Sequence, residues 1–173
     1  MMRKALLAAA VAVLALAGCS AQGTPTAESV APSRSSSPTP TVHAMSAEEA
    51  AKYYTAAVCP ANKAIDANNA AFAAQDLASI QQTAATARDA YRAEAAAFTR
   101  ADVFWPSVVS SADMKLITDA DFNMISTYGA ISTSATLEAA NATSNGYVDN
   151  GAGAAAQRIR LALNLPADTS AGC

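Results

Sequence analysis

The sequence predicts an all-α domain, a small up-and-down bundle of three to four helices stapled by one disulfide between Cys59 and Cys173. Apolar residues recur three and four positions apart from residue 46 onward, which is the spacing of one helix face. No run alternates between apolar and polar residues, and no hairpin turn joins β-branched segments, so strands are not expected. The 128 residues of 46–173 suffice for one compact helical bundle domain.

The first helix is expected to begin after Ser46. The run from Ser46 to Glu49 has the form of a capping box, in which a hydroxyl and a carboxylate satisfy free amides of the first turn. Pro60 interrupts this helix, and we expect a kink near Cys59 rather than an end because the apolar pattern resumes in phase. The apolar positions on one side are Tyr54, Val58, Ile65 and Phe72.

A second helix is expected from a cap at Asp76 to about Arg100. Its apolar residues recur three and four positions apart and form a seam for packing against another helix. The seam has one gap, at Glu94 or Ala95. The residues of this seam are Leu77, Ile80, Ala84, Ala87, Tyr91 and Phe98.

A third helix is expected from Pro106 to about Asn141, since proline suits a first helical position. Its high serine and threonine content leaves open whether it is continuous or broken near Asp119. Residues 142–151 are expected to form a turn-rich connection. A short fourth helix, 151–164, is then stopped by Pro166.

The N-terminus has the pattern of an export signal. A basic start, a dozen apolar residues and the run Leu16-Ala17-Gly18-Cys19 predict that residues 1–18 are removed. With a cysteine at the cut, the segment resembles the signals of bacterial lipoproteins, whose cysteine takes up acyl chains such as palmitate. The alternative is a plain secretory signal in which Cys19 merely follows Gly18. We expect lipidation at Cys19 and an extracytoplasmic protein anchored by its lipid to the cell membrane.

Residues 19–45 are expected to form a lipid-anchored, disordered Ser/Thr/Pro-rich tether. Four of the seven prolines lie here, and nothing is apolar or periodic enough to pack. His43 has no second metal ligand nearby and is expected to be a solvated linker residue. Removal of 1–18 changes the net charge from −3 to −5, which argues against nucleic acid or an anionic membrane surface as partner.

Of the three cysteines, Cys19 lies at the end of the signal, and Cys59 and Cys173 lie in the domain. Export places Cys59 and Cys173 on the oxidising side of the membrane, where disulfides persist. Their bond would close a loop of more than 100 residues, which in the chain-entropy model stabilises the fold by about 4–5 kcal/mol. The alternatives are a reactive thiol and an intermolecular bond, neither of which has a motif such as Cys-x-x-Cys beside it.

Several short runs in the domain also resemble one group of proteins. They are Val58-Cys59-Pro60-Ala61-Asn62, Trp105-Pro106, and an Arg-x-Arg-Leu helix leading to Leu165-Pro166 and a late cysteine. These runs resemble small helical surface lipoproteins of high-GC Gram-positive bacteria, a group with no assigned activity. The resemblance implies an architecture and a location, and no chemistry.

The usual catalytic and metal-binding residues are missing from the domain. From residue 46 onward there is no histidine, and no free cysteine once the pair is joined. This excludes Ser-His-Asp and Cys-His catalysis. It also removes the usual ligands of zinc, copper and haem, so neither a metal nor a cofactor is expected. Asp119, Asp121 and Asn123 match three ligand positions of a calcium loop, but Met124 and Ala130 replace its glycine and glutamate.

Catalysis by carboxylates alone is the remaining chemistry. It needs two carboxyls about 5–10 Å apart in a cleft, as in glycosidases. Asp89 with Glu94, or Asp113 with Asp119 and Asp121, are the candidates, although charged helix faces supply such pairs without any function.

The candidate interaction residues are Asn62, Phe104 and Trp105. Asn62 lies on the apolar stripe and is expected to bond a carbonyl freed by the kink at Pro60, with ligand binding as the alternative. Phe104 and Trp105 are expected to plug the end of the core or, if exposed, to anchor a partner. Five tyrosines are expected in the core and could instead line a pocket between helices: Tyr53, Tyr54, Tyr91, Tyr128 and Tyr147.

These observations favour a non-catalytic binding or interaction module in the cell envelope, whose partner is an envelope protein or a small ligand. The alternatives are an envelope hydrolase that uses carboxylates only and a structural spacer without ligand. Acidic residues with raised pKa in a concave site would favour the enzyme. An apolar or aromatic patch without them would favour binding.

Replacing the lipobox cysteine tests the anchor. Cys19→Ala should abolish labelling by a fatty-acid analogue, because the acylated thiol is gone, and should release the protein to the medium or leave it unprocessed. Labelling is followed on the protein recovered from cells. Undiminished labelling of the variant would contradict lipidation at Cys19.

Overall fold

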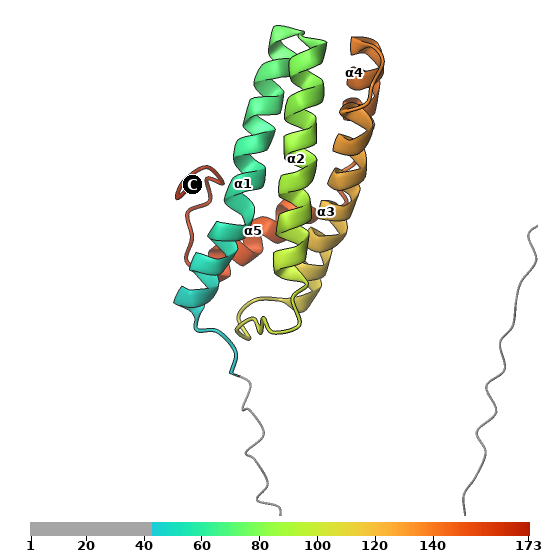
Figure 1. Ribbon diagram of the computed structural model, residues 1–173. Coiled ribbons are helices and arrows are strands. Elements are labelled where there is room, and N and C mark those ends of the chain that lie inside the picture. Colours follow the sequence, from blue (N-terminus) through green and yellow to red (C-terminus); the bar gives the residue numbers. More distant parts are fainter. Residues whose placement is uncertain (1–42) are drawn as a thin grey trace, which may run out of the picture. The chain divides into compact units, whose positions relative to one another are not determined.

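The computed structural model describes residues 43–173, and this part of the chain contains five helices (Figure 1). Within this part there is no strand, so the all-helical prediction is confirmed, with five helices in place of three to four. The signal, Cys19 and the tether up to residue 42 lie outside the described residues. The helices are α1 (Ala47–Ala74), α2 (Leu77–Phe98), α3 (Ser111–Ile131), α4 (Leu137–Asn145) and α5 (Ala152–Ala162).

The first two helices begin where the local signals place them. The Ser46 hydroxyl accepts from the Glu49 amide at 3.2 Å, and the Glu49 carboxylate accepts from the Ser46 amide at 2.8 Å, which completes the capping box. α1 continues through Pro60 without ending. Gln75 has a φ of 56°, and this left-handed turn reverses the chain so that Asp76 caps α2.

α3 begins later than the sequence predicted. Pro106 does not start a helix; its carbonyl accepts from the Val109 amide at 2.9 Å within a turn. Ser110 is the N-cap, and its hydroxyl accepts from the Asp113 amide. A side-chain acceptor at the cap therefore determines the start of this helix, rather than the fixed φ of the proline.

The sequence left open whether the third helix breaks near Asp119; α3 is continuous there and ends before residues 132–136. The hydroxyls of Ser132, Thr133 and Ser134 donate to the carbonyls of Gly129 and Ala130. These bonds compete with continuation of the helix. Thr136 then caps α4, whose residues the sequence predicts as the end of the third helix and the start of the turn-rich connection.

The three long helices lie side by side, α4 packs on α3, and α5 runs across the bundle (Figure 1). Alanines at Ala61, Ala64, Ala84 and Ala87 are buried between α1 and α2. Their small side chains let the two helices approach closely and suit a helix interior. Asn68 of α1, 1% exposed, donates to the carbonyl of Ile80 in α2 and ties the two helices together.

The buried apolar residues form two clusters along the bundle. The first contains Phe98 and Ile117, and the second contains Tyr91 and Tyr128. On α2, Glu94 lies between Tyr91 and Phe98; on α3, Asp121 lies between Ile117 and Tyr128. A polar layer therefore interrupts the apolar core where the two clusters meet.

The predicted disulfide is confirmed: Cys59 of α1 and Cys173 are joined, with Cα atoms 5.2 Å apart. The bond returns the tail that follows α5 to the side of α1 (Figure 1). None of the helices in the described part of the chain is long and apolar enough to cross a membrane.

Opening the disulfide should cost stability. The double variant Cys59→Ser, Cys173→Ser should lower the free energy of unfolding by up to about 4 kcal/mol, because the unfolded chain is no longer constrained by a closed loop. Urea denaturation measures the difference, and the unaltered protein treated with a thiol reductant should reproduce it. Equal midpoints with and without the bond would show that it contributes nothing.

Candidate functional site

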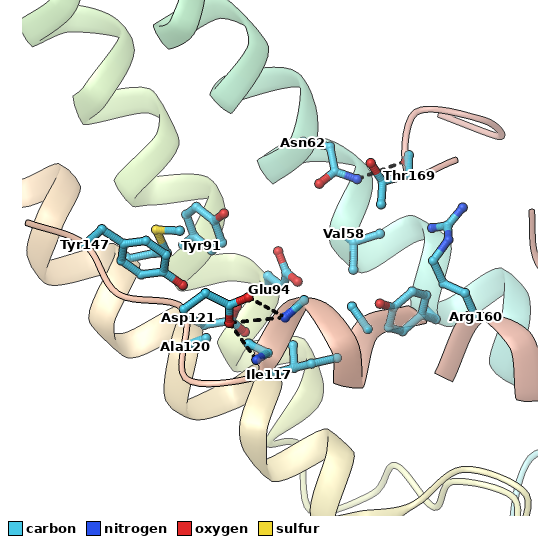
Figure 2. Close-up of a pocket in the computed structure, with 16 residues that line it drawn as sticks. Val58, Asn62, Tyr91, Glu94, Ile117, Ala120, Asp121, Tyr147, Arg160 and Thr169 are labelled. Carbon is cyan, nitrogen blue, oxygen red and sulfur yellow. Dashed lines mark hydrogen bonds between the residues drawn. The ribbon is translucent and has the colours of Figure 1, made fainter. Parts of the chain in front are cut away.

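A pocket of about 300 Å³ lies where α1, α2 and α3 meet α5 and the tail (Figure 2). This volume is at the low end of the range for small-molecule sites. The ionisable side chains that line it include three carboxyls, three phenols and one guanidinium. They are Glu94, Asp121, Asp149, Tyr54, Tyr91, Tyr147 and Arg160.

Glu94 and Asp121 are the buried acidic groups of this pocket. They approach it from α2 and α3 (Figure 2), and their residues are only 5% and 3% exposed. Burial raises the pKa of the Glu94 carboxyl, and the nearby charge of Asp121 raises it further. Burial also raises the pKa of Asp121. Each carboxyl therefore binds its proton more tightly than an exposed acid does.

One oxygen of this pair has no partner. Asp121 Oδ2 is buried and makes no hydrogen bond within the described part of the chain. An unsatisfied buried acceptor costs about 1–3 kcal/mol, so such atoms are rare in folded proteins. The pocket thus contains an acceptor that a bound donor would satisfy.

Two of the polar side chains around the pocket, the guanidinium of Arg160 and the amide of Asn62, are by contrast already hydrogen-bonded. Arg160, 2% exposed, donates from Nε to the Pro166 carbonyl at 2.7 Å and from Nη2 to the Asp168 carbonyl at 2.6 Å. Asn62 donates from Nδ2 to the carbonyl of Thr169 at 3.1 Å. These bonds hold the tail against α1 and α5, and they leave these side chains less able to donate to a ligand.

Asp149 occupies the N-terminus of α5. Its Oδ1 accepts from the amides of Gly151 and Ala152 at 3.0 and 2.7 Å, as an acid at the positive end of a helix does. Gly151 has a φ of +95°, which favours glycine. A Cβ at Gly153 would lie 2.9 Å from Asp149 Oδ2, so this glycine gives the carboxylate room.

The tyrosines give the pocket aromatic walls. Burial, with a smaller effect of the Glu94 charge, raises the pKa of Tyr54 to about 12. Tyr91 stacks on Tyr128 with ring centroids 5.8 Å apart, and burial raises its pKa as well. These phenols stay neutral and can donate or accept a hydrogen bond.

The sequence predicts five tyrosines in the core, with a pocket between helices as the alternative. Tyr54, Tyr91 and Tyr147 line this one. Tyr128 is buried in the second apolar cluster. The Tyr53 hydroxyl donates to the Ala97 carbonyl at 2.7 Å, outside the pocket.

The acids that the sequence grouped as candidate catalytic pairs do not lie together in the structure. Asp89 is exposed and pairs with arginines of its own helix. Asp113 pairs with Arg158 of α5, and Asp119 with Lys115 one turn away.

Only one acid from each grouping reaches the pocket, Glu94 from the first and Asp121 from the second. The calcium-loop match lies on the continuous helix α3 instead of a loop. Within residues 43–173 no group of three or more His, Cys, Asp or Glu could hold a metal ion.

The three candidate interaction residues have separate places. Asn62 bonds the tail, not a carbonyl freed by Pro60. Trp105 packs edge-on against Phe98 with centroids 5.9 Å apart and so covers the end of the first cluster. Phe104 is 40% exposed, and its carbonyl accepts from the Met45 amide.

The signal for the buried acids was present in the sequence. Glu94 occupies the gap of the α2 seam, and Asp121 follows Ile117 by one turn on the inner face of α3. An acidic residue on an apolar stripe indicates a buried carboxyl. That two such residues meet depends on how α2 and α3 are aligned, which helix periodicity does not determine.

Comparison of this chain with models of protein families, with curated proteins and with solved structures found no match.

The acidic pair should make stability fall as pH rises. Because their pKa values are raised in the folded state, the folded chain holds protons that the unfolded chain has released, and the free energy of unfolding decreases with pH. The decrease should be about 1.4 kcal/mol per pH unit for each such proton, from about pH 5 upward through the raised values. Urea denaturation at a series of pH values measures it.

Glu94→Gln and Asp121→Asn should each flatten this dependence, because the amides do not titrate. Asp119→Asn, on the exposed face of the same helix as Asp121, is the matched control and should leave the dependence intact. If the free energy of unfolding has the same slope against pH in the unaltered protein and all three variants, Glu94 and Asp121 do not titrate in this range.

Proposed function

We propose that this protein is a lipid-anchored binding module on the outer side of the cell membrane, and that the pocket containing Glu94 and Asp121 binds a small ligand. The observation that carries the proposal is the buried, unpartnered oxygen of Asp121 in a pocket of small-molecule size. A ligand that donates to this oxygen would remove a desolvation cost that the empty pocket retains.

The hydrogen bonds already made by Arg160 and by the first amides of α5 also support binding over catalysis. Acyl transfer and related hydrolyses need donors aimed at a developing oxyanion. Here the guanidinium of Arg160 bonds to tail carbonyls, and the first amides of α5 bond to Asp149. The pocket offers the unpartnered oxygen of Asp121, which suits a ligand that donates a hydrogen bond.

The anchor and the pocket have complementary roles in this proposal. Lipidation of Cys19 and the Ser/Thr/Pro-rich tether would hold the domain at the membrane, and the pocket would bind its ligand there. The disulfide between Cys59 and Cys173 is compatible with an oxidising location. A structural spacer is less well supported, because a spacer needs no pocket.

A hydrolase that uses carboxylates alone is the second candidate. The specific observation in its favour is that two acids with raised pKa share a concave site, as expected of an enzyme. Such an enzyme must place a scissile bond, and for inversion also a water, between its two carboxyls. A pocket of about 300 Å³ leaves little room for the two sugar units of such a substrate.

A pocket-filling variant tests the proposed function. The purified chain is screened by thermal shift against a panel of small amines, alcohols, carboxylates and monosaccharides. At least one class should stabilise it, because ligands that bind only the folded state raise the melting temperature. Ala156→Leu, which adds three carbons to the pocket wall, should abolish that stabilisation. Ala154→Leu, exposed on the same helix and outside the pocket, should retain it.

Two results would count against binding as the function. Stabilisation by no class, or equal stabilisation of both leucine variants, would exclude this pocket as the ligand site. Turnover of aryl glycosides that is lost in both Glu94→Gln and Asp121→Asn would favour the hydrolase instead.

A further inference from the structure

We propose that the ligand of this pocket is a small organic cation, a primary amine or an amidinium, whose N–H groups bind the carboxyls of Glu94 and Asp121. This inference rests on the proposed function and specifies its ligand class. It follows from the charges that face the pocket, the unpartnered oxygen, and the aromatic and apolar walls.

The charges that face the pocket do not balance. α2 and α3 contribute the acids Glu94 and Asp121, and the loop before α5 contributes Asp149. α5 contributes one cation, Arg160, and the lining residues of α1 and the tail are neutral. Asp149 is satisfied by α5 amides, and Arg160 bonds to carbonyls rather than to either acid. Glu94 and Asp121 are thus left without a positive partner.

The unpartnered oxygen selects a donor. Asp121 is 3% exposed, its Oδ2 has no hydrogen bond among residues 43–173, and an ionised carboxylate can only accept. An ammonium carries three donors, and its bonds to a carboxylate are roughly twice as strong as bonds between neutral groups. A neutral alcohol can donate one such bond and leaves the acidic pair uncompensated.

The walls favour an organic cation over a bare metal ion. Tyr54, Tyr91 and Tyr147 can attract a cation to their ring faces, and Val58, Ile117 and Met124 can cover an apolar stem. Calcium takes six to eight oxygen ligands, whereas no group of three acidic, histidine or cysteine ligands capable of holding a metal occurs in the described part of the chain.

Binding should be linked to the release of protons. Without a ligand, burial raises the pKa of both acids, and the charge of Asp121 raises that of Glu94 further, so the pair retains protons to a higher pH than exposed acids do. A cation beside them favours their ionised form, so its entry expels those protons. The affinity for a cation should then rise with pH, by up to about tenfold per pH unit for each proton released.

Probes matched in shape and differing in charge test this inference. The probes are benzylamine, benzyl alcohol and benzoate, with the cyclohexylmethyl and pentyl analogues of each, titrated into the purified chain by calorimetry. The amines should bind at least about tenfold more tightly than the alcohols, and the carboxylates should not bind. Titration in two buffers of different ionisation enthalpy counts the protons, and up to about two should be released per amine.

Substitutions test whether amine binding and proton release depend on Glu94 and Asp121. Glu94→Gln and Asp121→Asn should each weaken amine binding by at least about tenfold and reduce the number of protons released. Asp119→Asn should bind as the unaltered protein does. Ala156→Leu should block every probe that occupies the pocket.

The outcomes separate this inference from the proposed function. Alcohols or carboxylates that bind as tightly as the amines, with Ala156→Leu blocking them, would overturn the cationic ligand and leave the pocket as a binding site. Amine affinity that falls between about pH 5 and pH 8, where the amines stay protonated, would also overturn it. Binding of none of the nine probes at any pH would overturn the ligand class, and if no compound of the thermal-shift panel stabilises the chain either, the proposed function is overturned as well.

Discussion

The candidate site depends on the C-terminal segment being held against the three long helices. α5 packs on α3, and the tail beyond it returns to α1 through the bond between Cys59 and Cys173. The buried guanidinium of Arg160 fixes the path of the tail by donating hydrogen bonds to two of its backbone carbonyls, those of Pro166 and Asp168. The disulfide and the hydrogen bonds of Arg160 thus hold the tail, which contributes Thr169 to the wall of the pocket.

The same pocket interrupts the apolar core at a cost in stability. Glu94 and Asp121 occupy positions that an apolar side chain would fill with a gain in packing and without desolvation. Residues that lower stability where the fold does not need them are typical of functional sites. The unpartnered oxygen of Asp121 is consistent with a role in binding, since a fold that needed only stability would pair or replace it.

Local signals were sufficient for most of the secondary structure. Ser46 and Asp76 cap helices where their side chains predict it, and apolar spacing indicated the long helices α1 and α2. The end of α3 was misplaced because hydroxyls that bond to preceding carbonyls look, in sequence, like ordinary helix residues. Pro106 was similarly ambiguous, since its fixed φ suits a turn as well as a first helical residue.

By itself the sequence determined the all-helical class and the disulfide, because these follow from apolar spacing and cysteine count. Tertiary structure alone decided which acids meet. Glu94 and Asp121 are 27 positions apart, and each had been grouped with a different acid nearby in the chain. The physical reason is that helix periodicity specifies which face a residue lies on, whereas the alignment of one helix against another depends on the packing of all their side chains.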